Sequence, residues 1–124
     1  MTDDTFVEAL TKDRRTMNLL LASVQNLTLS AQRSPLGTDA HKETLRKVQE
    51  ACKTLRQNNL TRITRFPQYK KEITKQNIIL GTINTAIANL LRTGDVSDSQ
   101  ELENIKEIML TYLTTSGKDL KKAA

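Results

Sequence analysis

Residue types suited to catalysis or metal binding are scarce in this chain, which holds a single histidine, His41, and a single cysteine, Cys52. Zinc sites usually need three or four His, Cys or carboxylate ligands at short spacing, and one His and one Cys cannot build a site of the usual kinds. On one helix, these two residues would lie roughly 16 Å apart, too far for a nucleophile and its base. Glycine-rich phosphate loops are also absent. We therefore expect no catalytic residues, no cofactor, no metal site and no enzymatic activity.

A second chemical feature is a basic stretch in the middle of the chain. Between residues 53 and 75 there are seven positive side chains and one negative side chain, Glu72. Phosphate binding needs several cations on one surface, and a corner between two helices brings the end of one beside the start of the next. Free N–H groups at a helix start also favour an anion. The candidate binding residues, which we call the basic corner, are Arg62, Arg65, Lys70, Lys71 and Lys75.

Two aromatic residues, Phe66 and Tyr69, lie within the same stretch and could stack on nucleic-acid bases. Phe66 is equally suited to closing the end of a hydrophobic core, because Pro67 interrupts a helix directly after it. Three interpretations of the basic corner therefore stay open. It is a solvated surface, a site for nucleic acid or anionic phospholipid, or a site for an acidic protein segment.

Two polar residues, Asp13 and Gln76, occupy positions that the hydrophobic spacing assigns to the interior. In antiparallel helices both would lie roughly 13 Å from the same end, near the heights of Arg56 and Tyr112. An unpaired interior carboxylate is costly. We therefore predict a buried polar layer in which Asp13 accepts hydrogen bonds from Arg56, Gln76 or Tyr112 and fixes the register of the helices. The alternative is that Asp13 lies at the edge of its apolar stripe and reaches water.

Three large apolar residues fall outside the expected core faces: Leu19, Leu29 and Ile78. Single exposed apolar residues are common in soluble proteins. If these residues align on neighbouring helices, they would form a contact surface for a partner helix or for another copy of the chain.

All of these residues must be positioned by helices, because apolar residues recur at alternating spacings of three and four along four segments. Proline and glycine residues separate the segments. The second helix is the least certain, since Asn58 and Asn59 are weak helix formers while Leu60 and Ile63 continue an apolar face to about Arg65. The predicted helices span about residues 4–32, 38–65, 67–93 and 98–116.

Four amphipathic helices with short connections must run antiparallel to their neighbours. We predict an all-α fold, a single up-down-up-down four-helix bundle with coiled-coil-like seams. The bundle is expected to occupy residues 1–117, followed by a flexible basic tail at residues 118–124. We find no internal repeat and no second domain.

The chain has 124 residues, of which 37% are hydrophobic and 27% charged, a composition that suits one domain. The first residues, MTDDTF, are acidic rather than basic as in a targeting leader. No apolar run reaches the length of about eighteen residues that a membrane span needs. We expect no transmembrane segment and an intracellular location, cytoplasmic or nuclear.

The net charge of +5 is concentrated in residues 34–94, which carry eleven positive and four negative side chains. A bundle fold alone does not define a function. Our leading hypothesis is a non-enzymatic protein–protein interaction module, an adaptor or a subunit of a larger complex. It would bind a partner helix or acidic segment through its helical faces, and homo-oligomers are compatible with it. The second hypothesis is binding of nucleic acid or anionic lipid through the basic corner.

Overall fold

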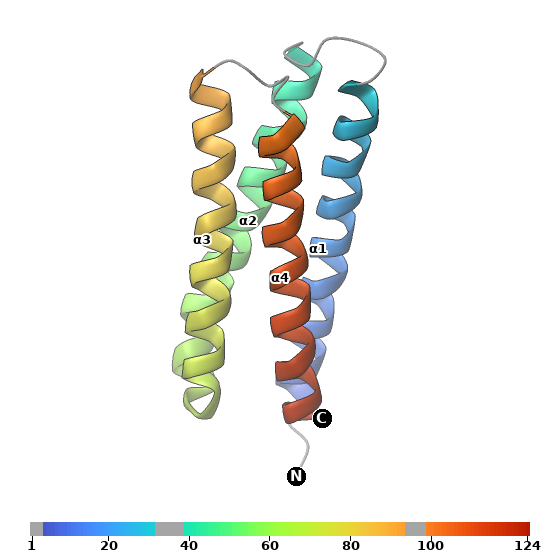
Figure 1. Ribbon diagram of the computed structural model, residues 1–124. Helices are drawn as coiled ribbons and strands as arrows, with labels where there is room; N and C mark the ends of the chain where they lie inside the picture. Colours follow the sequence, from blue (N-terminus) through green and yellow to red (C-terminus); the bar gives the residue numbers. More distant parts are fainter. Residues whose placement is uncertain (1–3, 32–38, 94–98) are drawn as a thin grey trace.

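The computed structural model describes residues 4–31, 39–93 and 99–124. Within these residues the chain forms four α-helices and a short 3-10 turn, with no strand. The expected all-α four-helix bundle is confirmed (Figure 1). The elements are α1 (Asp4–Ala31), α2 (Asp39–Arg65), the turn η1 (Pro67–Tyr69), α3 (Lys70–Thr93) and α4 (Ser99–Ala123).

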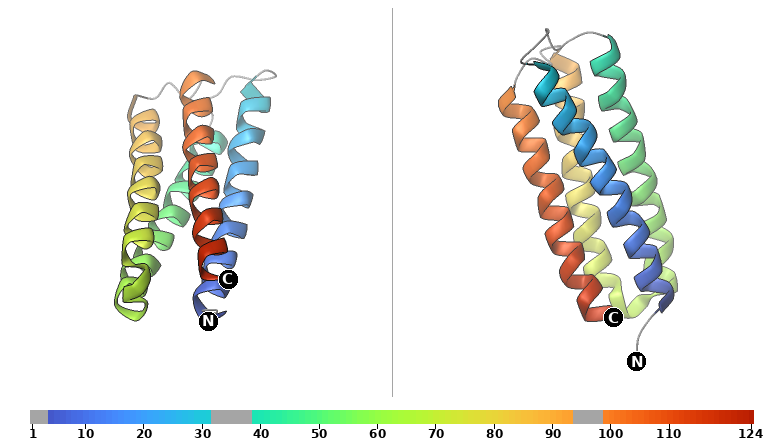
Figure 2. Two further views of the ribbon diagram at one scale, coloured as in Figure 1. Left: turned by 60° about the horizontal axis from the view of Figure 1, so that its bottom comes forward. Right: turned by 90° about the vertical axis from the view of Figure 1, so that its right-hand side faces the viewer.

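The helices are arranged as a ring in which each one packs against two others. The closest pairings are α2 with α3 and α1 with α4, followed by α3 with α4, while α1 and α2 make a smaller contact. In both views of Figure 2, the turn from α2 to α3 lies at the end of the bundle where α1 begins and α4 finishes. We call this the lower end. In this ring, α2 and α4 are the two neighbours of α3.

Along each helix, every third or fourth residue is buried in the interior, as the sequence spacing predicts. In α1, Leu21 is buried and Leu20 packs at the edge of the core. In α4, Ile108 and Leu113 are partly buried and flank the core. The largest fully buried apolar side chains include Met17, Leu45, Leu80, Ile83, Ile87, Leu102, Ile105 and Met109.

The second helix continues past Asn59 to Arg65, but with a different face inward than we expected. Leu60 projects into solvent with 62% of its surface exposed, whereas Asn59 is buried. The expectation that Leu60 continues the interior face is therefore wrong. The spacing of three and four runs instead from Leu55 through Asn59 and Arg62 to Phe66. Polar side chains thus occupy two core positions of α2.

A separate hydrophobic cluster closes the lower end, and it is built around three aromatic rings. Phe6 meets Phe66 edge-on, with ring centroids 5.4 Å apart, and stacks against Tyr69 at 4.2 Å. Leu10, Ile73 and Ala123 complete the cluster together with Phe6 and Phe66. Phe66 therefore closes the core, as one of the sequence interpretations proposed.

The expected end of the fourth helix near residue 116, with a tail at 118–124, is wrong. α4 continues to Ala123, whose surface is only 2% exposed. The reason is that the interior spacing does not stop at Tyr112: it passes through Ser116 to Ala123, and Leu120 packs against the lower cluster. Gly117, which suggested a helix end, lies within the helix.

This packing predicts that substitutions at two adjacent alanines at the end of α4 differ strongly in their effect on stability. Ala123→Asp should destabilise the fold by about 1–3 kcal/mol, because it places an unpaired carboxylate in the lower cluster. Ala124→Asp should change the free energy of unfolding by less than about 0.5 kcal/mol, because Ala124 is exposed. Urea unfolding followed by circular dichroism measures both. Equal effects of the two substitutions would mean that the end of α4 is not packed.

Candidate functional site

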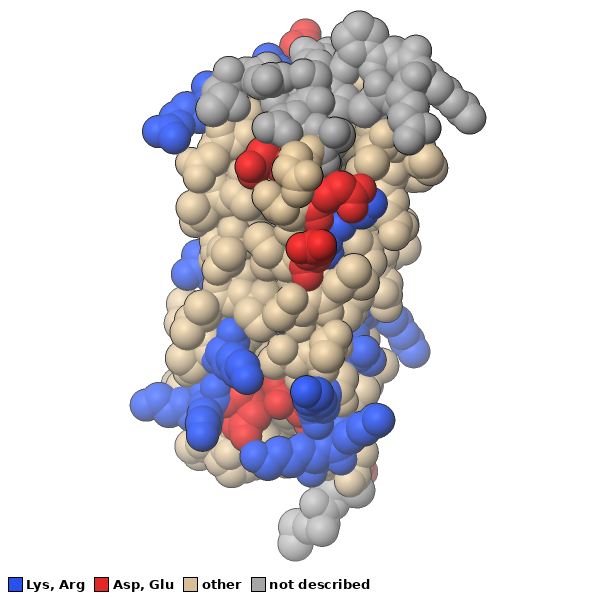
Figure 3. Space-filling model, in the orientation of Figure 1, with Lys and Arg blue, Asp and Glu red and all other residues tan. Residues whose placement is uncertain are grey.

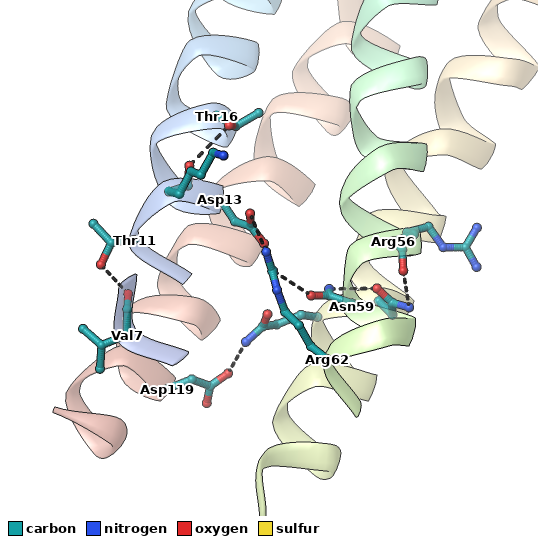
Figure 4. Close-up of polar contacts among 11 residues, drawn as sticks. Val7, Thr11, Asp13, Thr16, Arg56, Asn59, Arg62 and Asp119 are labelled. Carbon is teal, nitrogen blue, oxygen red and sulfur yellow. Dashed lines mark hydrogen bonds and ion pairs between the residues drawn. The ribbon is translucent and has the colours of Figure 1, made fainter. Parts of the chain in front are cut away.

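The most deeply buried charged group in the described residues is Asp13 of α1, which meets Arg62 of α2 in the lower half of the bundle (Figure 4). Asp13 is 3% exposed, and the Arg62 side chain is 16% exposed. Arg62 donates from both terminal nitrogens, from Nη1 to Asp13 Oδ2 and from Nη2 to Oδ1 at 3.4 Å. A two-point contact adds directional specificity to the attraction between a guanidinium and a carboxylate.

Asparagine side chains extend the pair from α2 to α3. Arg62 Nη1 also donates to Asn59 Oδ1 at 3.3 Å, and Asn59 Nδ2 donates to Asn77 Oδ1 at 2.8 Å. Asn77 Nδ2 in turn donates to the backbone carbonyl of Arg56 at 3.4 Å. A continuous chain of hydrogen bonds therefore runs from α1 across α2 to α3.

Two further contacts join α4 to its neighbours at a similar height. Gln76 of α3 is 1% exposed, and its Nε2 donates to Asp119 Oδ2 at 2.9 Å. Arg14 of α1 donates from Nε to Ser116 Oγ at 3.2 Å and from Nη2 to the Leu113 carbonyl at 3.3 Å. Every adjacent pair of helices is thus linked by side-chain hydrogen bonds. We call this set the polar layer: Asp13, Arg14, Asn59, Arg62, Gln76, Asn77, Ser116 and Asp119.

The sequence prediction of a buried layer chose the wrong cation. Asp13 and Gln76 are both buried, but the partner of Asp13 is Arg62 and not Arg56. Arg56 is exposed, and its guanidinium carbon lies 3.4 Å from where a Cβ on Gly81 would be. Asn59 and Asp119 were not predicted. Continuing the spacing of three and four beyond Leu55 would have located Asn59 and Arg62.

Two reactive groups are enclosed by the same core. Burial raises the pKa of the Cys52 thiol to about 12, so the thiol stays protonated near neutral pH and is not a nucleophile there. Burial also raises the pKa of Tyr112, and the nearby charge of Asp13 adds to that effect. The Tyr112 hydroxyl has no hydrogen-bond partner within residues 4–31, 39–93 and 99–124. The prediction that Tyr112 donates a hydrogen bond to Asp13 is therefore wrong.

The basic corner loses one of its five members, because Arg62 turns inward to Asp13. Arg65, Lys70, Lys71 and Lys75 are exposed. Arg65 lies over the Phe66 ring, with its guanidinium carbon 5.3 Å from the centroid. The two aromatic rings of the corner, Phe66 and Tyr69, already pack on Phe6.

Cations surround the whole lower half of the bundle, not the corner alone. Residues 4–15, 53–75 and 112–124 contain thirteen Lys and Arg against five Asp and Glu. In Figure 3 the basic side chains gather at the lower end and enclose a few acidic ones, while other acidic side chains lie higher on the same face. The described residues above this half hold five Lys and Arg and six Asp and Glu.

Three of the five carboxylates in the lower half are held by hydrogen bonds within the protein. Asp13 accepts from Arg62, Asp119 accepts from Gln76, and Glu72 accepts from Lys122 Nζ at 2.6 Å. The hydrogen bond from Lys122 lowers the pKa of Glu72, and the same bond raises the pKa of Lys122. These carboxylates are therefore oriented toward internal partners, which leaves most of the surrounding cations facing solvent.

The outer face of α3 is different in character, because residues 76–91 contain no charged side chain. A groove of about 520 Å³ runs along this face and is lined by small or uncharged residues of α3. Arg56 from α2 and Glu101 from α4 also line it. The three apolar residues that we expected outside the core are exposed: Leu19 by 71%, Leu29 by 58% and Ile78 by 66%. Of these, Ile78 lies in the α3 groove.

Across the described part of the chain, no group of three His, Cys, Asp or Glu residues is placed to hold a metal ion. None of the helices within those residues is long and apolar enough to cross a membrane. No protein-family model, curated protein or solved structure matches the chain. Its function must therefore be inferred from its own geometry.

The polar layer predicts very different roles for two arginines six positions apart. Arg62→Ala should destabilise the fold by about 3–5 kcal/mol, because the buried Asp13 carboxylate loses its cation. Arg56→Ala should cost less than about 0.5 kcal/mol, since that side chain is exposed. Chemical denaturation of the two variants compares them directly, and a larger loss for Arg56→Ala would contradict the pairing.

A charge-free double variant separates the cost of an unpaired charge from the loss of packing. Asp13→Leu combined with Arg62→Met should recover most of the stability lost in Arg62→Ala, because apolar side chains of similar size replace a buried ion pair at little cost.

Proposed function

We propose that this protein is a non-enzymatic protein-interaction module, an adaptor or complex subunit that binds its partner through the outer face of α3. The observation that carries the proposal is the charge-free stretch of residues 76–91 on a helix whose outer face is exposed. In the chain as a whole, 27% of residues are charged. Depletion of charged residues is characteristic of the central part of protein–protein interfaces.

The shape of this face supports the same proposal. The groove is shallow and open to solvent, and Ile78 supplies an exposed apolar contact within it. α1 also has a charge-free stretch, residues 16–32, with Leu19 and Leu29 exposed. The groove on α1, however, is lined by Glu8, Lys12 and Arg15 in the charged lower half. The α3 face is therefore the better candidate for a protein partner.

A non-enzymatic role agrees with the chemistry of the buried groups. The Cys52 thiol is protonated and enclosed, and the polar layer uses its hydrogen bonds to connect helices. The proposal includes an intracellular location, cytoplasmic or nuclear, in keeping with a single unpaired cysteine.

Site-specific photocrosslinking in cells tests the α3 face. A photoreactive amino acid at Ile78 or Thr85 should give a discrete crosslinked product, whereas the same residue at Leu60, which is equally exposed but lies on α2, should not. Adding Thr82→Arg to the chain labelled at Ile78 should abolish the product by placing a charge in the groove. Equal crosslinking from Ile78 and Leu60 would refute the proposal.

A second candidate function is favoured by a separate observation, the thirteen cations of the lower half against five carboxylates, three of them engaged internally. Such a surface attracts a polyanion, either nucleic acid or an anionic membrane. Because the aromatic rings of the basic corner pack on Phe6, binding would rest on phosphate contacts and not on base stacking.

Salt dependence tests this second function. If the lower end binds RNA, DNA or anionic vesicles, Lys71→Ala with Lys75→Ala should weaken binding and reduce the slope of log K against log salt by about 1–2 for nucleic acid. Arg46→Ala with Lys47→Ala removes the same charge from the upper half and should leave the slope unchanged. An equal loss in both double variants would indicate a general charge effect without a defined surface.

A further inference from the structure

We propose that the partner of the α3 face is a second copy of the same chain, and that the protein forms a two-fold symmetric dimer through this face. The inference deepens the proposed function and rests on it, because it names the occupant of the same groove. It is carried by the two charged side chains that line the groove, Arg56 and Glu101.

These two charges have opposite signs and come from opposite sides of α3. Arg56 belongs to α2 and lies against Gly81. Glu101 belongs to the first turn of α4, at the end of the bundle where α3 finishes. The groove reaches Asn89 near that end, roughly 12 Å along α3 from Gly81 at 1.5 Å per residue. One positive and one negative charge therefore lie diagonally across a face that is otherwise uncharged.

A surface with this charge pattern is complementary to itself. In a two-fold symmetric dimer both copies use the same surface. A rotation of 180° about an axis midway between the two charges, at right angles to the line joining them, exchanges their positions. Arg56 of each copy is then placed against Glu101 of the other copy, and a single operation forms two ion pairs. A second copy of the chain therefore carries both complementary charges at the required positions.

The residues between the two charges permit close contact. Gly81 has no side chain, and Thr82 and Thr85 are small, so a helix can approach this face at the 8–10 Å separation typical of packed helices. Ile78, which is 66% exposed, would be covered by the other copy. The four ion pairs within the described residues involve other cations, so Arg56 has no carboxylate among them. Dimerisation would provide one.

The size of the face sets the expected strength. From Asn77 to Asn89 the face is roughly 18 Å long. A single helix face of that length offers less area than the ~800 Å² per partner of a standard interface. We therefore expect a weak dimer with a dissociation constant in the micromolar range. Concentrations from about 5 to 500 µM should take the protein from monomer to dimer.

Sedimentation velocity over that range tests the dimer. The native chain should show concentration-dependent dimerisation, and Thr85→Arg should abolish it by placing a charge at the centre of the face. Leu110→Asp is the matched control, because Leu110 is exposed on α4 outside the groove, and it should leave the dissociation constant within about twofold. A monomer at all concentrations, or a dimer indifferent to Thr85→Arg, would overturn the inference.

Charge reversal gives a second readout that does not depend on disrupting the face. Arg56→Glu and Glu101→Arg should each weaken the dimer by about tenfold or more, because each places like charges together at two sites. The double variant Arg56→Glu/Glu101→Arg should restore the native dissociation constant within about threefold, since both ion pairs re-form with their signs exchanged. Failure of the double variant to recover would refute the two-fold pairing, provided that circular dichroism shows native helix content.

The outcomes also separate the inference from the proposed function. A chain that stays monomeric, yet still gives a crosslink from Ile78 to a different protein, overturns the dimer and supports the interaction module. A monomer that gives no crosslink from Ile78 overturns both. A crosslink between two copies that disappears with Thr85→Arg supports both.

Discussion

We infer that the register of this bundle depends on the buried ion pair between Asp13 and Arg62. Apolar seams alone allow helices to slide or to exchange neighbours at modest cost, because leucine and isoleucine accept many partners. A carboxylate that is 3% exposed accepts far fewer arrangements, since every alternative leaves a charge unpaired in the interior. The pair therefore selects one arrangement of α1 and α2, and the amides of Asn59 and Gln76 extend that selection to α3 and α4.

The upper and lower parts of the bundle interior are packed differently. The upper part is a continuous apolar core that includes Met17, Leu45, Ile83 and Ile105. The lower part contains the polar layer and an aromatic cluster centred on Phe6 and Phe66. Apolar packing contributes most of the stability through the area it removes from water. The polar layer contributes specificity, because its partners must match in chemical type and direction.

The sequence was sufficient to predict the helices and most of the core, because a repeat of three and four residues has one simple structural solution. It was insufficient where a polar residue continued that repeat. Asn59 and Arg62 keep the spacing of α2, but their side chains suggested surface, and Leu60 suggested interior. Gly117 similarly suggested a helix end, although the contacts of Leu120 with the lower cluster hold the helix beyond it. Which cation neutralises Asp13 depends on side-chain reach across helices, and spacing within one helix does not report it.

The uneven distribution of charge makes this elongated molecule an electric dipole whose axis follows the helices, with thirteen cations against five carboxylates at one end. In the field of a polyanion such a molecule would rotate until its lower, basic end faces the polyanion. The uncharged face of α3 runs parallel to the long axis and would then point sideways, away from the charged surface. The two candidate surfaces therefore face different directions, although both include Arg56, so that one molecule could be oriented by the first while it is joined to a neighbour by the second.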